Sequence, residues 1–231
     1  MEQDFMNLRN LIRELSPKFI DIYDINFYSK SGGVVLNLNL YGIYLLITNI
    51  EFEKSLRNSD YIHIDGVGAA VLVKIITGKY FKPVGYRQWG HRLLLCANSL
   101  GLVFIGGTAR ENLCAKKRVS EEYDSGSIEG VNGYMPKEEY FELIGSTPNK
   151  IIIVGLGMPK QELIITILSK RYADKWFFAC GGWIKQLAGL ESESPEWVSK
   201  LKLEWLHRSI GRKNHFNQRV MKPLICILKN F

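Results

Sequence analysis

Residues 151–171 read IIIVGLGMPKQELIITILSKR, in which a strand pattern runs through glycines into a helix pattern. The run Ile151–Gly157 is apolar and β-branched, as in a strand that is buried on both faces of a sheet. The segment Pro159–Tyr172 repeats apolar residues at helical spacing, and Pro159 suits the first turn because its missing N–H costs nothing there. These residues therefore predict a buried strand, a glycine turn and a helix.

The same alternation extends in both directions along the chain. Further strands are predicted at Val34–Leu40, Tyr61–Asp65, Leu102–Gly107 and Trp176–Gly182, with a weaker candidate at Ser127–Tyr134. Further helices are predicted at Tyr41–Asn58, Val67–Thr77, Gly90–Ser99, Ala109–Tyr123 and Lys137–Ile144. Strands separated by helices of this length form βαβ units. The predicted fold class is therefore α/β, with a Rossmann-like, mainly parallel sheet flanked by helices.

The last 37 residues differ from the rest in charge. The chain of 231 residues has a net charge of +7, and residues 195–231 hold eight Lys or Arg against two Glu, a net charge of +6. We predict an α/β core at residues 1–194 and a basic helical appendage at 195–231, which begins with a helix at Pro195–Ser209. Aromatic and aliphatic residues between the charges favour an anionic membrane surface or a diphosphate as partner. A solvated helix face and a nucleic-acid partner are the alternatives, and nucleic acid is not predicted.

The composition excludes several classes of protein. With 46% hydrophobic and 23% charged residues, the chain is typical of a globular protein and not of a disordered one. The acidic start of the chain lacks the basic region of a signal peptide, and no apolar run reaches the roughly 18 residues of a membrane span. The histidines show no metal-binding spacing, so no metal is expected. Buried thiols in a reducing compartment are expected at Cys96, Cys114, Cys180 and Cys226. We therefore expect a cytoplasmic protein, peripheral on the inner face of the membrane.

Asp65 is the first candidate for chemistry. It ends a predicted strand and is followed by Gly66, Val67 and Gly68, where the next helix begins. A carboxylate at the carboxyl end of a parallel strand projects into the ligand crevice, and the glycines let a substrate approach the backbone. Asp65 is equally suited to cap the next helix. Its position alone therefore leaves catalysis, ligand binding and capping open.

Two amides and two glycines are further candidates. Asn37 and Asn39 lie two residues apart in a predicted strand and so share one face, where a sugar could supply their hydrogen bonds if the face is buried. A water-facing edge strand is the alternative.

Gly155 and Gly157 resemble a dinucleotide fingerprint whose third glycine is replaced by Lys160, which disfavours an oxidoreductase. The N–H groups at the start of the helix can still bind a phosphate or ribose.

Taken together, these motifs resemble the WecG/TagA/CpsF family of bacterial glycosyltransferases, which build teichoic acid, common antigen and capsule. The resemblance runs from about Val34 to Arg219. It rests on four motifs in order, at residues 65–68, 155–162, 187–189 and 204–208.

The resemblance implies inverting transfer of a hexose-type sugar from a UDP-sugar to an undecaprenyl-diphosphate-linked saccharide during cell-surface polysaccharide biosynthesis, without cofactor or metal. It implies that Asp65 is the general base that deprotonates the acceptor hydroxyl. It also implies that Asn39 and Gln161 hold the donor. Appendage residues expected to meet the lipid diphosphate and the membrane are Arg208, Arg212 and Arg219. Further substrate contacts are expected from Asn37, Gly66, Lys82, Arg87, Tyr134, Gly155, Gly157 and Lys185.

The chain departs from the family at several donor-side positions. Asn37 stands where the family usually has Thr, Lys82 where it has Arg, and Lys185 where it has Asp. Gly85 is followed by Tyr86 and Arg87 in place of a short polar residue and Asp. The donor is therefore not inferred from the N-acetylmannosamine transferases of the family, and another hexose or a uronic acid recognised by Lys82, Arg87 or Lys185 is a hypothesis. A homo-oligomer and an inactive family member both stay open.

Overall fold

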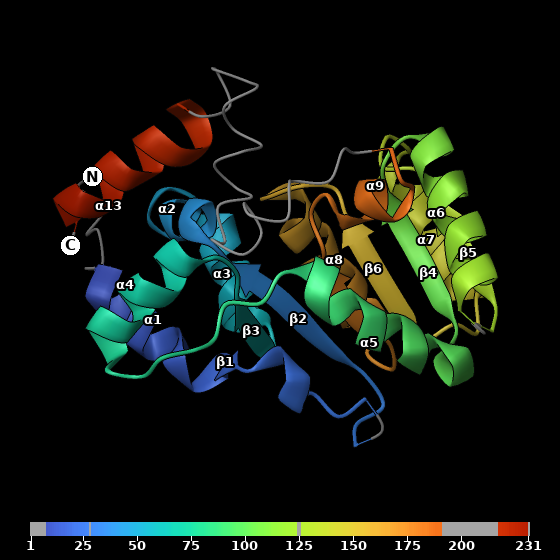
Figure 1. Ribbon diagram of the computed structural model, residues 1–231, viewed down its shortest axis with the longest axis horizontal. Helices are drawn as coiled ribbons and strands as arrows, with labels where there is room; N and C mark the ends of the chain where they lie inside the picture. The colour runs from blue at the N-terminus through green and yellow to red at the C-terminus, as the bar shows by residue number, and fades with distance from the viewer. Residues whose placement is uncertain (1–7, 28, 124–125, 191–216, 231) are drawn as a thin grey trace.

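The computed structural model describes residues 8–27, 29–123, 126–190 and 217–230, and it contains a seven-stranded sheet (Figure 1). The strand order is β1-β3-β2-β7-β6-β4-β5, and every pairing is parallel. The strands are β1 (Phe19–Ile20), β2 (Gly33–Leu38), β3 (Tyr61–Ile64), β4 (Leu102–Gly106), β5 (Ile128–Val131), β6 (Ile151–Gly155) and β7 (Trp176–Ala179). The predicted α/β fold with a mainly parallel sheet is confirmed.

Helices cover both faces of the sheet and form two separate hydrophobic cores with it. The first core includes residues of α1 (Leu8–Leu15), α2 (Leu40–Thr48), α3 (Ile50–Asn58), α4 (Val67–Thr77), α7 (Lys137–Ser146), α8 (Lys160–Arg171) and α13 (Lys222–Asn230). The second includes residues of α5 (Tyr86–Leu100), α6 (Ala109–Glu122) and α9 (Trp183–Leu187). Shorter helical turns occupy Ser16–Lys18, Ile22–Asp24 and Asn217–Met221. Along β2, Leu36 and Leu38 enter the first core and Val35 the second, because strand side chains alternate between faces.

The strands end earlier than predicted at their carboxyl ends. β2, β3 and β7 stop one to three residues before the predicted limits, so Asn39, Asp65 and Gly181 lie just beyond the sheet. The turns explain the difference. Gly66 and Gly181 have φ values of 83° and 56°, which end the extended conformation and which glycine adopts without strain. The polar and glycine residues are therefore placed in the turns and not in the strands.

The helices differ from the prediction in three places. The predicted helix Tyr41–Asn58 divides into α2 and α3 at Asn49, whose backbone is extended and whose side chain accepts a hydrogen bond from Phe52 N at 2.9 Å. This N-cap starts a second helix because Asn satisfies one of the free N–H groups there. The helix predicted at Gly90–Ser99 begins earlier, at Tyr86. α1, β1 and α9 were not predicted, and β1 has only two residues.

The last described helix belongs to the folded body of the protein. α13 lies alongside α2 at one end of the molecule, and its Ile227 is buried in the first core (Figure 1). The helix predicted at Pro195–Ser209 lies outside the described residues. The boundary at residue 194 stays a prediction. In the part of the chain that the structure describes, no helix is both long and apolar enough to span a membrane.

Candidate functional site

The carboxyl ends of the strands form the edge at which the candidate residues meet. After β2 the chain enters α2 on one face of the sheet, and after β7 it enters α9 on the opposite face. β2 and β7 are neighbours in the sheet. Adjacent strands whose following helices lie on opposite faces leave a crevice at this edge, where open parallel sheets bind ligands. The site is therefore expected between the ends of these strands.

Asp65 lies at this edge, directly after β3. Its backbone N–H donates to the carbonyl oxygen of Leu38 at the end of β2, with an N···O distance of 3.0 Å. This bond holds the Asp65 backbone against the neighbouring strand. The N-cap residue of α4 is Gly66 and not Asp65. The half-buried Asp65 thus lies where the sequence placed it, beside the crevice.

Three glycines at the strand ends border open space. Among the described residues, no heavy atom lies within 4 Å of the position that a side chain would take at Gly66, Gly157 or Gly181. A substrate can therefore approach the backbone closely at these turns. Gly155 is different, because a Cβ there would lie 2.7 Å from the carbonyl oxygen of Gly181. Gly155 lets the ends of β6 and β7 come together.

Gln161 connects the two sides of the crevice. Its side-chain oxygen accepts a hydrogen bond from Gly181 N at 3.1 Å, and its Nε2 donates to Glu162 Oε1 at 2.7 Å. The residue is fully buried in the first turn of α8. Both ends of the amide are therefore used within the protein, in a bracing role that the sequence did not indicate. The donor contact expected of Gln161 stays a prediction.

Glu162 is a buried acid in the motif at residues 155–162, and its place in the sequence indicates no role for it. Burial raises the pKa of its carboxyl to about 7, against the effect of the hydrogen bond from Gln161. Within the described part of the chain, Oε2 has no hydrogen-bond partner. Helical spacing carries a partial signal for this burial: Glu162 lies three residues before the buried Ile165.

Asn37 and Asn39 do not share a strand face. Asn37 lies in β2, which is a central strand, and it is only 5% exposed, so the water-facing alternative is wrong for it. Asn39 lies beyond the strand and caps α2, where its side chain accepts a hydrogen bond from Gly42 N at 2.9 Å. The strand ends at Leu38 because this cap starts the helix.

Tyr86 and His63 form the wall of the site on the second face of the sheet. Their rings are 6.5 Å apart in an edge-to-face arrangement. Burial lowers the pKa of His63 to about 4, so the ring is neutral at pH 7. Burial also raises the pKa of the Tyr86 hydroxyl well above its usual value, and Cys180, Asp65 and Glu162 add to this effect electrostatically. Both carboxyls thus contribute to the electrostatic surroundings of the Tyr86 hydroxyl, which the sequence around Tyr86 did not reveal.

The other residues predicted to contact the substrate come from several separate elements. Lys82 is exposed in the segment before α5, and the ammonium of Lys185 lies 3.8 Å from Glu111 Oε1. Tyr134 is 80% exposed after β5. Arg87 is described as a backbone position in the first turn of α5. Their contacts with a substrate stay predictions.

The predicted appendage contacts lie mostly beyond the described chain. Arg208 and Arg212 lie outside the described residues, and Arg219 is a backbone position in the turn Asn217–Met221.

All four cysteines are free thiols. The prediction that they are buried is right for Cys180 and wrong for the other three, which are partly exposed. In the described ranges, no three His, Cys, Asp or Glu side chains are grouped to hold a metal.

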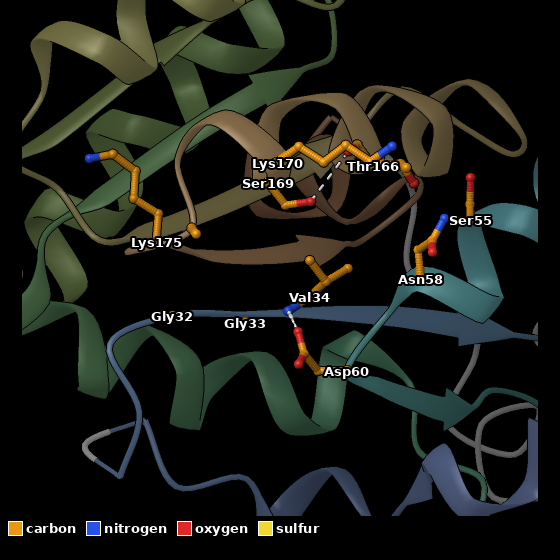
Figure 2. Close-up of a pocket in the computed structure, with 11 residues that line it drawn as sticks. Gly32, Gly33, Val34, Ser55, Asn58, Asp60, Thr166, Ser169, Lys170 and Lys175 are labelled. Carbon is orange, nitrogen blue, oxygen red and sulfur yellow. Dashed lines mark hydrogen bonds between the residues drawn. The ribbon is translucent and has the colours of Figure 1, made fainter.

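A groove of about 410 Å³ lies at the opposite edge of the sheet (Figure 2). It is lined by the start of β2 and by the ends of α3 and α8, with Val34, Asn58 and Ser169 among its residues. The carboxylate of Asp60 in this groove already accepts a hydrogen bond from Val34 N at 2.9 Å (Figure 2). This groove is separate from the strand ends that carry Asp65.

Comparisons with known proteins match most of the chain. A family model described as "Glycosyl transferase WecG/TagA/CpsF family" matches residues 15–230. The N-acetylglucosaminyldiphosphoundecaprenol N-acetyl-beta-D-mannosaminyltransferase of Bacillus subtilis (strain 168) is 23% identical over 209 residues, 88% of this chain and 78% of that protein. The UDP-Gal:alpha-D-GlcNAc-diphosphoundecaprenol beta-1,4-galactosyltransferase of Shigella boydii is 27% identical over 190 residues, 79% of this chain and 78% of that protein.

Proposed function

The chain belongs to the glycosyl transferase WecG/TagA/CpsF family, and from that premise we propose that it moves a hexose-type sugar from a UDP-sugar to an undecaprenyl-diphosphate-linked saccharide. Both relatives are named as transferases that act on a diphosphoundecaprenol-linked sugar, and one of them is named for UDP-Gal. The product would serve cell-surface polysaccharide biosynthesis. The observation that carries the proposal is the position of Asp65 at the carboxyl edge, held against the end of β2.

Asp65 is the proposed general base. Its carboxylate takes the proton of the acceptor hydroxyl while that oxygen forms a bond to the anomeric carbon of the donor. The bond from the anomeric carbon to the UDP oxygen breaks at the same time, and its electron pair leaves with UDP. Attack from the face opposite the leaving group inverts the anomeric centre. The charge that develops on UDP needs cations or helix-terminal N–H groups nearby.

The start of α8 is the proposed source of those N–H groups. α8 begins directly after the glycine turn at Gly157, whose side-chain position opens into space free of other described residues. Lys82, Arg87 and Lys185 are the side chains proposed to supplement it. The reaction is proposed to need no metal ion, and this part rests on the resemblance alone.

The acceptor lipid is proposed to be reached from the inner face of the cell membrane. The net charge of +6 in residues 195–231 supports this, because basic residues among apolar ones bind anionic membrane surfaces. Arg208, Arg212 and Arg219 are the proposed contacts to the lipid diphosphate. The polyprenyl-diphosphate acceptor and the membrane surface are thus the proposed partners.

A panel of UDP-sugars tests the proposal. Each is incubated with the protein and a short-chain polyprenyl-diphosphate saccharide, and products are scored by mass. We expect one UDP-hexose, UDP-N-acetylhexosamine or UDP-hexuronic acid to give a product heavier by one sugar residue. Absence of product with every UDP-sugar, together with equal affinity for UDP and other nucleotides, would contradict the proposal.

A further inference from the structure

Three buried side-chain oxygens at the carboxyl edge lack a hydrogen-bond partner among the residues that the structure describes. They are Asn37 Oδ1, the Tyr86 hydroxyl and Glu162 Oε2. The three residues are 5%, 8% and 0% exposed, respectively. A buried polar atom without a partner costs stability, and native proteins leave few of them. Such atoms gathered at one place indicate a ligand that completes their hydrogen bonds.

The three residues lie around one point of the edge. Asn37 is the register partner of His63 in the β2–β3 pair, so the two side chains lie on the same face of the sheet. The His63 ring in turn faces the Tyr86 ring at 6.5 Å. The Tyr86 ring also packs at 5.2 Å against Trp183, just after the turn in which Gly181 bonds to Gln161, the hydrogen-bond partner of Glu162. Asp65 is bonded through its backbone to Leu38, the neighbour of Asn37. The unpartnered oxygens therefore flank the proposed base.

Open space adjoins these atoms. Counting described residues only, no heavy atom lies within 4 Å of a side-chain position at Gly66, Gly181 or Gly182. Gly66 follows Asp65 directly, and Gly181 is bonded to Gln161 beside Glu162. A ligand that enters over these glycines can reach both Asp65 and the buried oxygens.

The chemistry of the three groups favours a neutral ligand. An amide oxygen accepts hydrogen bonds, a phenol donates and accepts, and a carboxyl in an apolar environment favours its protonated form, which donates. None of the three carries a positive charge. A phosphate or carboxylate placed against them would lack a counter-charge. The hydroxyl groups of a sugar can donate hydrogen bonds to these oxygens and accept hydrogen bonds from the phenol and the protonated carboxyl.

We propose that Asn37, Tyr86 and Glu162 form a subsite that binds the hydroxyl groups of a neutral sugar ring beside Asp65, and that Tyr86 helps to select this sugar. The proposal rests on the proposed function and deepens it, because it favours a neutral hexose over a uronic acid at this position. The ring belongs to the donor or to the acceptor, since both sugars meet at Asp65 during transfer. Kinetics with each substrate varied in turn distinguish the two.

The Tyr86→Phe variant tests the subsite. We expect kcat/KM to fall about tenfold for one substrate, the value of one lost hydrogen bond, while the affinity for UDP alone is unchanged. The melting temperature should be equal to or higher than that of the wild type, because the variant removes an unpaired buried hydroxyl. A change confined to the donor assigns the ring to the donor sugar, and a change confined to the acceptor assigns it to the acceptor sugar.

Two further variants complete the experiment. Glu162→Met removes both carboxyl oxygens at a similar side-chain volume and should lower kcat/KM for the same substrate as Tyr86→Phe does. Tyr140→Phe removes the hydroxyl of a buried tyrosine in α7 and should leave both kcat/KM values unchanged. The subsite is refuted if Tyr86→Phe keeps wild-type constants for both substrates, or if its loss of activity only parallels a loss of melting temperature. An inactive wild type across the UDP-sugar panel would instead overturn the proposed function.

Discussion

The side-chain oxygen of Gln161 accepts a hydrogen bond from the backbone N–H of Gly181, with an O···N distance of 3.1 Å. Gln161 lies in the first turn of α8 on one face of the sheet, and Gly181 lies in the turn that leads to α9 on the other face. The same amide donates to Glu162 at 2.7 Å. One side chain therefore links both walls of the crevice and orients the buried acid.

Replacement of Gln161 by Met should destabilise the protein at nearly constant side-chain volume. Glu162 Oε1 would lose its partner in a buried position, which costs about 1–3 kcal/mol, and the half-buried Gly181 N would lose its partner at a smaller cost. Urea denaturation followed by circular dichroism measures the free energy of unfolding. The exposed Gln88 of α5 provides the control, and Gln88→Met should change stability by less than about 0.5 kcal/mol. Equal stability of the two variants would show that the link contributes nothing.

Asp65→Asn should preserve the fold and lower kcat by about 100-fold or more, because an amide cannot take the proton of the acceptor hydroxyl. Turnover with the best UDP-sugar measures the effect, and a thermal melt checks the fold. Asp174→Asn is the matched control, since Asp174 is exposed before β7 at the opposite edge. Near-wild-type turnover of Asp65→Asn would remove the base assignment.

Asn39→Ser and Asn39→Ala separate two roles of one side chain. Alanine should cost about 1 kcal/mol of stability because the N-cap of α2 is lost, whereas serine should restore most of it. If Asn39 also holds the donor, both variants should raise KM for the UDP-sugar. A serine variant with wild-type stability and wild-type KM would leave Asn39 with a capping role only.

Two buried groups give opposite pH dependences of stability. The pKa of His63 falls to about 4 from 6.5, so stability is lost as the pH falls from 6.5 to about 4. The pKa of Glu162 rises to about 7 from 4.5, so stability is lost as the pH rises from 4.5 to about 7. Each shift corresponds to about 3 kcal/mol, and the two effects largely cancel between pH 4.5 and 6.5.

The Glu162→Gln variant should show the pH dependence of stability that comes from His63 alone. Relative to the wild type, the variant should gain about 3 kcal/mol on going from pH 4.5 to pH 7.5, because it no longer carries the buried acid. Urea denaturation at several pH values measures this difference. Glu139→Gln, at an exposed position of α7, should follow the wild type at every pH. A Glu162→Gln variant with the pH profile of the wild type would contradict the raised pKa.

The basic appendage is best tested by charge removal. A truncation after residue 194 would also remove Ile227 from the first core, and loss of binding would then be ambiguous. The double variant Arg208→Gln/Arg212→Gln should bind anionic vesicles about 30-fold more weakly, at about 1 kcal/mol for each charge. Lys137→Gln/Lys170→Gln removes the same charge from exposed positions on α7 and α8 and should bind as the wild type does. Unchanged co-sedimentation of the arginine variant would refute membrane contact by these residues.

The fold and part of the site could be predicted from the sequence. Apolar runs such as Ile151–Gly157 are visible locally, and parallel topology places their carboxyl ends together, so the position of Asp65 followed. The buried state of Glu162 could not be predicted in the same way. Its surroundings come from the neighbouring Gln161 and from Tyr86 and the turn after β7. The last two are distant in sequence and come near Glu162 only in the folded chain. Asn39 was predicted to lie in the strand, but it caps α2. The apolar run continues from the strand into the helix, so its pattern does not mark where the strand ends.

The strand order also bears on how the protein is synthesised. β1–β3 form one part of the sheet and β4–β6 the other, and β7 pairs with both β2 and β6. Of the described strands, the one that joins the two parts is thus the last to leave the ribosome. Until residue 179 has emerged, β2 and β6 each present an unpaired edge, and such edges promote aggregation. Prematurely terminated chains should therefore be insoluble, and the nascent protein should depend on chaperones late in its translation.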